Sequence, residues 1–191
     1  MTGSPGRILV VSGPSGSGKT TLVRRLLDDD PELVWSVSTT TRPPRRGEQD
    51  GRDYCFLGRD EFEQGIRAGD FAEYAESFGE LYGTPVVPLE NALSAGRVIV
   101  LDVDVQGARQ IRKRFPDACL IFVMAPTQDE LLRRLAGRGT EDDEARRKRT
   151  ERVRQELSAR DEYDHVVVNE DVQRALSELK TIVAHVKGSL G

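Results

Sequence analysis

One eight-residue segment constrains the fold of this chain more than any other: Gly13-Pro14-Ser15-Gly16-Ser17-Gly18-Lys19-Thr20, which fits the pattern G-x-x-x-x-G-K-[ST] at every fixed position. An apolar run precedes it at residues 8–11, and apolar residues recur at helical spacing over residues 22–27. Glycines allow backbone N–H groups to surround phosphate oxygens, and the helix that follows presents a partially positive N-terminus. In this pattern the lysine reaches the β- and γ-phosphates and the hydroxyl of Thr20 ligates Mg²⁺. The segment and its context therefore predict a site for a nucleoside triphosphate or diphosphate, in preference to a merely flexible Gly/Ser turn.

The remainder of the chain alternates apolar runs with segments of helical period. Runs at residues 98–103, 120–124 and 166–168 resemble the run at residues 8–11, and all four have the composition of buried parallel strands. A capping-box pattern, Thr127-x-x-Glu130, begins one of the helical segments. The last helix carries one apolar stripe, made of Val172, Leu176, Leu179, Ile182, Val183 and Val186. These features predict an α/β fold with a parallel sheet core that is flanked by helices.

Two stretches interrupt this alternation. Residues 36–90 lack long helices in our interpretation and hold seven of the eleven aromatic residues, and residues 53–57 and 71–78 are expected to be strands of a small antiparallel sheet. Residues 127–156 carry 17 charged side chains in 30 positions around a Gly137-Arg138-Gly139 turn, which predicts a charged helical flap. We expect a single domain with a core of residues 1–35, 91–126 and 157–191, into which both stretches are inserted.

Composition excludes several classes of protein. With 28 Lys and Arg against 32 Asp and Glu, the formal net charge is -4, which argues against a dedicated nucleic-acid binder. The first apolar run is too short for a signal peptide or a membrane span. Cys55 and Cys119 form no disulfide framework, and no Cys/His spacing resembles a zinc site. We therefore expect a cytoplasmic protein that is a monomer or a weak homo-oligomer and binds neither nucleic acid nor membrane.

Asp102 follows four apolar residues, Val98-Ile99-Val100-Leu101, as the acidic residue of a Walker B strand does. A carboxylate at the carboxyl end of a parallel strand lies at the crevice where ligands bind. An aspartate that only caps the strand end remains an alternative. Asp104, two residues later, carries a weaker signal of the same kind.

The first inserted stretch suggests an acceptor that carries a second phosphate. Arg42 and Arg45 lie three residues apart in a proline-stiffened loop and suit a phosphate group, although a solvated basic loop is the plainer interpretation of that segment alone. Tyr54 and Tyr82 could donate phenolic hydrogen bonds to the same phosphate. Glu73 could accept from the ring N–H and exocyclic amine of guanine, whose O6 and N7 need donors; the hydroxyls of Ser38 and Thr84 could supply them. Each residue singly fits packing or the surface; together they describe a pocket for a guanine monophosphate.

From residue 8 to about residue 187 the sequence resembles the guanylate kinases. The resemblance rests on the phosphate loop and on motifs that occur in the family's order: Val37-Ser38-Thr39-Thr40-Thr41-Arg42-x-x-Arg45-x-Gly47-Glu48, Gly51-x-x-Tyr54-x-Phe56, Phe71-x-Glu73, Tyr82-Gly83-Thr84, Leu101-Asp102-Val103-Asp104-x-Gln106-Gly107, Arg134-Leu135-x-Gly137-Arg138-Gly139 and Val168-Asn169. It implies a P-loop kinase with a parallel core, an inserted small and mostly antiparallel GMP-binding part at residues 36–90, and a helical lid at residues 127–156. It also implies transfer of the γ-phosphoryl group of ATP, bound with Mg²⁺, to GMP and by the same contacts to dGMP.

The resemblance assigns roles to individual residues. It places Arg42, Arg45, Tyr54 and Tyr82 on the GMP phosphate, and Ser38, Glu73 and Thr84 on guanine. It places Arg134, Arg138 and Arg149 in the lid over the triphosphate, where they join Lys19 in catalysis, and Asn169 at the adenine end. Asp102 either orients Mg²⁺-bound water or contacts the acceptor, and both roles stay open. A related fold that serves as a protein-interaction module, and a kinase for a different small acceptor, are the competing hypotheses.

Overall fold

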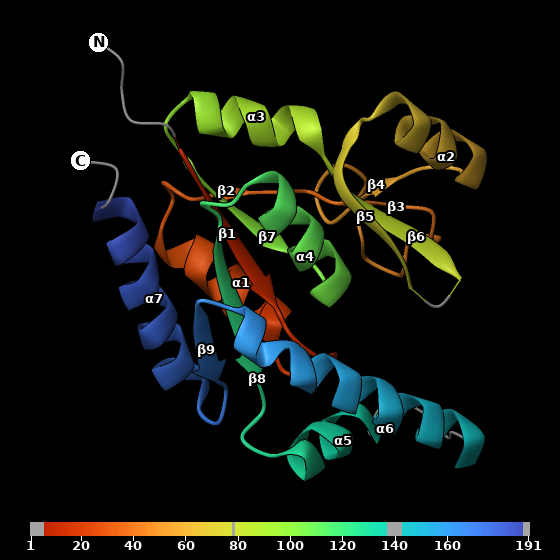
Figure 1. Cartoon of the computed structure of the whole chain (residues 1–191), viewed down its shortest axis with the longest axis vertical. Coiled ribbons are helices and arrows are strands. Elements are labelled where there is room, and N and C mark those ends of the chain that lie inside the picture. The colour runs from red at the N-terminus through yellow and green to blue at the C-terminus, as the bar shows by residue number, and fades with distance from the viewer. Residues whose placement is uncertain (1–5, 78, 137–142, 189–191) are drawn as a thin grey trace.

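A five-stranded parallel sheet forms the centre of the molecule, in the order β2-β7-β1-β8-β9 (Figure 1). The structure is a computed structural model that describes residues 6–77, 79–136 and 143–188. The strands of this sheet are β1 Arg7–Ser12, β2 Val34–Trp35, β7 Val98–Asp102, β8 Cys119–Met124 and β9 His165–Val168. The four predicted apolar runs lie in β1, β7, β8 and β9, which confirms the parallel core. The two-residue strand β2 was not predicted.

Both faces of this sheet are covered because alternate side chains of each strand point to opposite faces. Leu9 and Val11 of β1 join the apolar cluster on one face, to which helices α1 (Lys19–Asp29) and α7 (Val172–Gly188) contribute. Ile8 and Val10 join the cluster on the other face, with α3 (Val86–Ser94) and α4 (Val105–Arg114). The predicted apolar stripe of the last helix is buried from Leu176 onward, as expected.

A second sheet of four strands, in the order β4-β3-β6-β5, is built from the first inserted stretch and lies beside the core (Figure 1). Its strands are β3 Thr39–Thr40, β4 Cys55–Phe56, β5 Phe71–Ser77 and β6 Glu80–Pro85. Strand β6 is antiparallel to both β3 and β5, while β3 and β4 are parallel. The sheet is thus mostly antiparallel, as the sequence predicted.

The expectation that this stretch lacks long helices was wrong. Helix α2 spans Arg59–Ala68 and packs the ring of Phe62 on that of Phe71, with centroids 4.3 Å apart. Its only sizeable apolar residues are Phe62 and Ile66, one turn apart, so its periodicity is weak in the sequence. Helix α3 begins at Val86 and packs on the core sheet, so the chain returns to the core before residue 90.

Three helical elements follow β8: α5 (Gln128–Ala136), α6 (Asp143–Ser158) and the 3₁₀ helix η1 (Ala159–Glu162). Figure 1 shows α5 and α6 beyond the end of β8 from which the chain leaves the sheet. The Thr127 hydroxyl accepts the Glu130 N–H at 3.1 Å, which is one half of the predicted capping box. The Glu130 carboxylate accepts from Arg133 and Arg134 instead of completing the box. The predicted turn at residues 137–139 lies outside the described residues.

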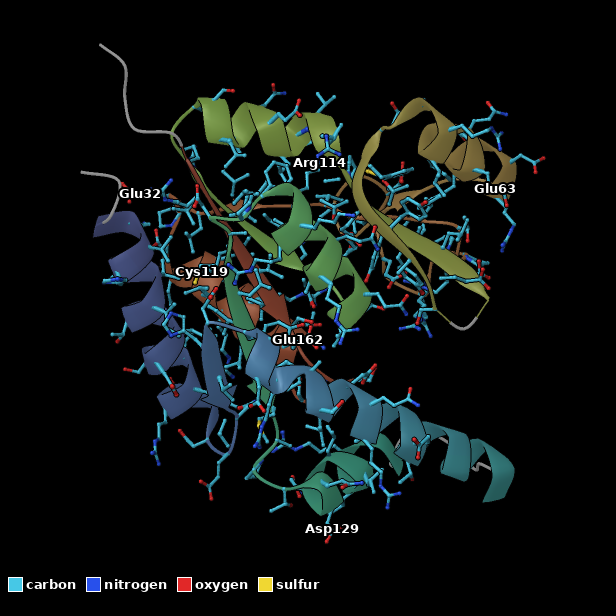
Figure 2. All side chains as sticks on the ribbon, in the orientation of Figure 1. Glu32, Glu63, Arg114, Cys119, Asp129 and Glu162 are labelled. Carbon is cyan, nitrogen blue, oxygen red and sulfur yellow. The ribbon has the colours of Figure 1, made fainter. Side chains whose placement is uncertain are left out.

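Helix α4 is fixed to the start of the final βα unit by two ion pairs. Arg109 contacts Glu162 of η1, which Figure 2 labels beside α4, and Arg112 contacts Asp164.

Within the described part of the chain, no helix combines the length and the apolar character that crossing a membrane requires.

Candidate functional site

The phosphate loop joins β1 to α1 in a conformation that requires glycine. Gly13, Gly16 and Gly18 have φ values of 134°, 82° and 91°, in the region that favours glycine. Gly18 is the N-cap of α1, and among the described residues no side chain caps this helix. The N–H groups of its first turn are thus available to an anion, at the positive end of the helix dipole. This is the loop geometry that the motif predicted.

Lys19 lies over the loop that precedes it. Its ammonium donates to the carbonyl oxygens of Gly13 at 2.6 Å and Pro14 at 3.3 Å. The positive charge of Lys19 therefore lies next to the Gly13 and Pro14 carbonyls at the start of the loop.

Thr20 and Asp102 meet although 82 residues separate them in the sequence. The Thr20 hydroxyl donates to Oδ2 of Asp102 at 3.2 Å, since β1 and β7 are adjacent and Asp102 pairs in register with Val11. Burial raises the pKa of Asp102, against the lowering effects of Lys19 and the Thr20 hydrogen bond. A hydroxyl and a carboxylate at one point suit Mg²⁺, which takes one or two protein oxygens and completes its shell with phosphates and water. Among the residues that the structure describes, no group of three or more His, Cys, Asp or Glu side chains could hold a metal by itself.

The two arginines of the inserted loop are organised by Glu48. Both terminal nitrogens of Arg42 donate to its carboxylate at 3.0 Å, and the Arg45 backbone N–H donates to it at 2.7 Å. The hydrogen bonds to Glu48 raise the pKa of Arg42. The guanidinium of Arg42 is also centred 5.3 Å from the ring of Tyr54, a cation–π contact. Glu48 is part of a motif named in the sequence analysis, but no role was predicted for it.

Tyr54 and Tyr82 stand edge to face with ring centroids 6.2 Å apart. Burial, followed by the charge of Asp102, raises the pKa of the Tyr54 phenol. The Tyr54 phenol is therefore neutral at neutral pH and can donate a hydrogen bond to a phosphate.

Glu73 is a buried carboxyl group, only 5 % exposed, on strand β5. Its Oε1 accepts the hydroxyl of Thr84 at 2.7 Å, across the β5–β6 pair and next to a register shift between Phe71 and Glu73. Burial raises its pKa to about 7, and the charge of Asp104 adds to the rise while Thr84 opposes it. Thr84 is fully buried, and its hydroxyl donates its hydrogen bond to Glu73. We had predicted from the sequence that this hydroxyl would donate to a base.

Asn169 follows β9 and supports the phosphate loop from the side. Its Nδ2 donates to the Ser17 carbonyl at 2.8 Å, and a Cβ on Gly18 would collide with the same amide. Its Oδ1 is buried without a hydrogen-bond partner among the described residues. Arg134 donates to the Asn169 carbonyl at 3.2 Å and to Glu130 at 2.8 Å. The hydrogen bonds from Arg133 and then Arg134 lower the pKa of Glu130 to about 2.

A cavity of about 660 Å³ brings most of these residues together. Fourteen of the residues that the sequence singled out line it: Gly13, Ser15, Gly16, Gly18, Lys19, Thr20, Ser38, Arg45, Tyr54, Glu73, Tyr82, Asp102, Arg134 and Asn169. Pro14, Ser17, Arg42 and Thr84 are not among its lining residues. Arg138 lies outside the described residues, and Arg149 lies in α6 with its side chain outside the described part. The lining also includes Asp104, Glu156 and Glu170, of which the sequence gave a weak signal only for Asp104.

Comparisons with known proteins identify relatives of this chain. A family model described as guanylate kinase matches residues 5–186. The chain is similar to the guanylate kinase of Rubrobacter xylanophilus, 51% identical over 181 residues and 95% of each chain. It is also similar to that of Synechococcus sp. (strain CC9902), 49% identical over 92% of this chain and 94% of the relative.

Solved structures show the same relationship. The crystal structure of guanylate kinase from Anaplasma phagocytophilum superposes with a TM-score of 0.81 at 35% identity, covering 98% of this chain and 89% of that one. A sugar kinase from Janibacter sp. HTCC2649 matches with a TM-score of 0.52 at 16% identity, a likeness of fold alone.

Proposed function

Because this chain belongs to the guanylate kinase family, whose reaction transfers a phosphoryl group from ATP to GMP, we propose a role in that reaction for each part of the cavity. One observation carries the assignment. Most residues of the phosphate loop and most of the residues expected to bind a guanine monophosphate line the same cavity, so that a donor and an acceptor nucleotide would share it.

The acceptor side recognises the two ends of GMP separately. Arg45, Tyr54 and Tyr82 bind its phosphate, with Arg42 behind them as a fixed positive charge. Glu73 accepts from the ring N–H and the amine of guanine, and its burial makes an unmet hydrogen bond costly.

Ser38 and Thr84 complete the guanine pocket in different ways. Ser38 lines the cavity and can face the base directly. Thr84 acts through Glu73, since its hydroxyl is already bonded to that carboxylate. Ser38 thus orients the base directly, and Thr84 orients it by holding the Glu73 carboxylate.

The donor side holds the ATP phosphates in the loop from Gly13 to Thr20. The backbone N–H groups and Lys19 neutralise the β- and γ-phosphates, and Arg134 approaches from α5. The buried Oδ1 of Asn169 has no hydrogen-bond partner in the described part of the chain, which supports a place for this residue at the adenine end, where it would accept from the base amine. Arg138 and Arg149 keep their proposed lid role from the family resemblance alone.

Thr20 and Asp102 are the residues that would hold Mg²⁺, Thr20 as a ligand and Asp102 through water. Bound with ATP, Mg²⁺ supplies charge neutralisation on the triphosphate. The hydrogen bond between the two side chains keeps their oxygens at one place. Asp102 also lines the cavity and can contact the acceptor, so its two roles stay open.

Catalysis in this proposal consists of positioning and charge neutralisation. The GMP phosphate is already an anionic nucleophile, so no general base is needed. Closure of residues 36–90 and 127–156 over the core would exclude water, which otherwise would receive the phosphoryl group. The three-part division, the cytoplasmic location and the monomeric or weakly oligomeric state remain predictions.

A coupled assay of ADP release tests the proposal. We expect turnover with GMP, a lower but clear turnover with dGMP, and little with AMP, CMP or UMP. Equal turnover of AMP would contradict the guanine pocket. No ADP release with any acceptor, from a folded protein that binds GMP, would favour an interaction module that has lost catalysis.

A further inference from the structure

Helix α4 contains a buried glycine, Gly107, where the helix itself does not need one. Gly107 lies in the first turn, and it is not among the residues with positive φ. Alanine is the better helix former at such a position because glycine loses more backbone freedom on folding. The reason for glycine here must therefore lie in what surrounds it.

The space that a Gly107 side chain would fill is taken by Glu73. A Cβ at this position would overlap Oε2 of Glu73 and would lie 3.0 Å from its Cδ. It would also lie 3.2 Å from Cβ of Val103, a tight but smaller conflict. The carboxylate is held from two sides, with Oε1 on the Thr84 hydroxyl and Oε2 against the backbone of α4.

One turn later the same helix holds the strand that carries Glu73. Gln110 donates from Nε2 to the Tyr74 carbonyl at 2.7 Å and accepts the Tyr74 N–H at 3.2 Å. Strand β5 is the edge of its sheet, so the Gln110 amide supplies the pairing that a further strand would otherwise give. The side chain of Glu73 and the backbone of the next residue thus both rest on α4.

The start of α4 is itself fixed to the phosphate end of the cavity. The Gly107 N–H donates to Oδ1 of Asp104 at 2.9 Å, which caps the helix two residues after Asp102. Asp102, proposed for Mg²⁺, and Gly107, against which Glu73 packs, therefore lie within one short segment of the chain.

We propose that α4 sets the position of the Glu73 carboxylate, with Gly107 as a positioning residue for guanine recognition and Gln110 as its second support. The inference rests on the proposed contact of Glu73 with guanine. A carboxylate that serves both the ring N–H and the exocyclic amine must be placed accurately. Hypoxanthine, the base of IMP, has the ring N–H but lacks the amine, so a displaced Glu73 loses more with GMP than with IMP.

Steady-state kinetics of Gly107→Ala test the placement. We expect KM for GMP to rise about tenfold, the cost of one impaired hydrogen bond to a charged group, while KM for ATP changes less than about twofold. The preference for GMP over IMP in kcat/KM should also fall, because IMP has no exocyclic amine contact with Glu73 to lose. Lys113→Ala, an exposed change in the last turn of α4, is the control and leaves all these values as in the wild type.

Glu73→Gln, measured in parallel, separates the two possible failures. If it raises KM for GMP selectively while Gly107→Ala leaves KM for GMP and the GMP-to-IMP preference unchanged, or raises both KM values equally, the positioning role is overturned and the guanine role stands. If Glu73→Gln has no selective effect on GMP, the guanine role of Glu73 falls, and with it this inference.

A thermal-unfolding cycle tests the contact without reference to activity. Gly107→Ala should lower the unfolding midpoint in the wild type. In a Glu73→Ala background, where the carboxylate is gone, the same change should leave the midpoint unchanged or raise it. An equal loss in both backgrounds would show that Glu73 is not what Gly107 accommodates.

Discussion

The Glu48 carboxylate accepts from both terminal nitrogens of Arg42, each at 3.0 Å. The arginine side chain is only 12% exposed. Arg42 also donates from Nη1 to the Pro43 carbonyl at 2.7 Å, so three hydrogen bonds to Glu48 and Pro43 fix the orientation of its charge. A phosphate approaching Arg45 and the tyrosines finds that charge already in place.

Removing the charge of Glu48 should consequently weaken GMP binding. In Glu48→Gln we expect KM for GMP to rise about tenfold with KM for ATP unchanged, because one neutral amide oxygen replaces the two charged oxygens that accept from Arg42 and the Arg45 backbone. Steady-state kinetics with each substrate varied in turn measure this. Glu63→Gln, which alters an exposed ion pair with Arg59 on the outer helix α2 (Figure 2), is the matched control and should behave as the wild type. A Glu48 variant with wild-type KM for GMP would show that Arg42 needs no such support.

Lys19→Ala should reduce kcat by roughly a hundred- to a thousandfold, because a charge at the loop is lost where negative charge develops on the transferred group. The unfolding midpoint and circular dichroism spectrum should stay close to those of the wild type, since the Lys19 ammonium donates to the carbonyls of Gly13 and Pro14, for which water can substitute as the donor. Near-normal turnover would remove Lys19 from the reaction.

Binding of GMP should depend on pH through Glu73. Its pKa is raised to about 7 in the free protein, chiefly by burial and also by Asp104, and the carboxylate form is the one that accepts from guanine. Below that pH, binding must first remove a proton, so KM for GMP should fall as pH rises and level off above about pH 7. The GMP phosphate titrates in both the wild type and Glu73→Gln, so the ratio of their KM values isolates the carboxyl group. A ratio that is constant from about pH 5 to pH 8 would contradict the prediction.

The same group should make stability decrease as pH rises. The pKa of Glu73 is higher in the folded state, about 7, than the ordinary 4.5. The folded state thus binds more protons between these values, and its advantage is present at low pH and lost as pH rises through 7. The unfolding midpoint of the wild type should therefore fall relative to that of Glu73→Gln from about pH 5 to pH 8. If the difference in midpoint between the wild type and Glu73→Gln does not change with pH, or changes with the opposite sign, burial does not disfavour the ionised form of Glu73.

Asn169→Ala should destabilise the fold by about 1–3 kcal/mol, because the Ser17 carbonyl would lose a buried donor. KM for ATP should rise more than KM for GMP. Urea unfolding gives the free energy, and kinetics give the two KM values. Asn91→Ala, an exposed change on α3, serves as the control. An unchanged free energy of unfolding would exclude Asn169 as a support of the loop.

The central sheet could be predicted because parallel strands buried on both faces leave continuous apolar runs in the sequence. The strands β2 and β3 have two residues each, too few to show any period, whereas β4 lies within the strand predicted at residues 53–57. Helix α2 went unpredicted because it buries only a narrow stripe around Phe62. The phosphate loop could be located because its chemistry is local, eight consecutive residues with a fixed spacing.

The supporting residues of the site could not be predicted in the same way. Glu48 stood in a recognisable motif, but its function depends on the conformation of the loop. The contacts of Gly107 and Gln110 with β5 join segments more than thirty residues apart. Gly107 stood in a recognisable motif without a role, and Gln110 gave no signal beyond an amide in a helix. Thr84 was expected to face a base, and its use on Glu73 depends on the pairing of β5 with β6.

The hydrogen bond from Asn169 to Ser17 spans 152 residues and so bears on how the molecule is made. During synthesis the phosphate loop leaves the ribosome well before β9, the strand that precedes Asn169. A nascent chain that stops before β9 has the whole loop motif and not the amide that supports it. Competence to bind nucleotide should therefore arise late, when the last strand joins the edge of the sheet.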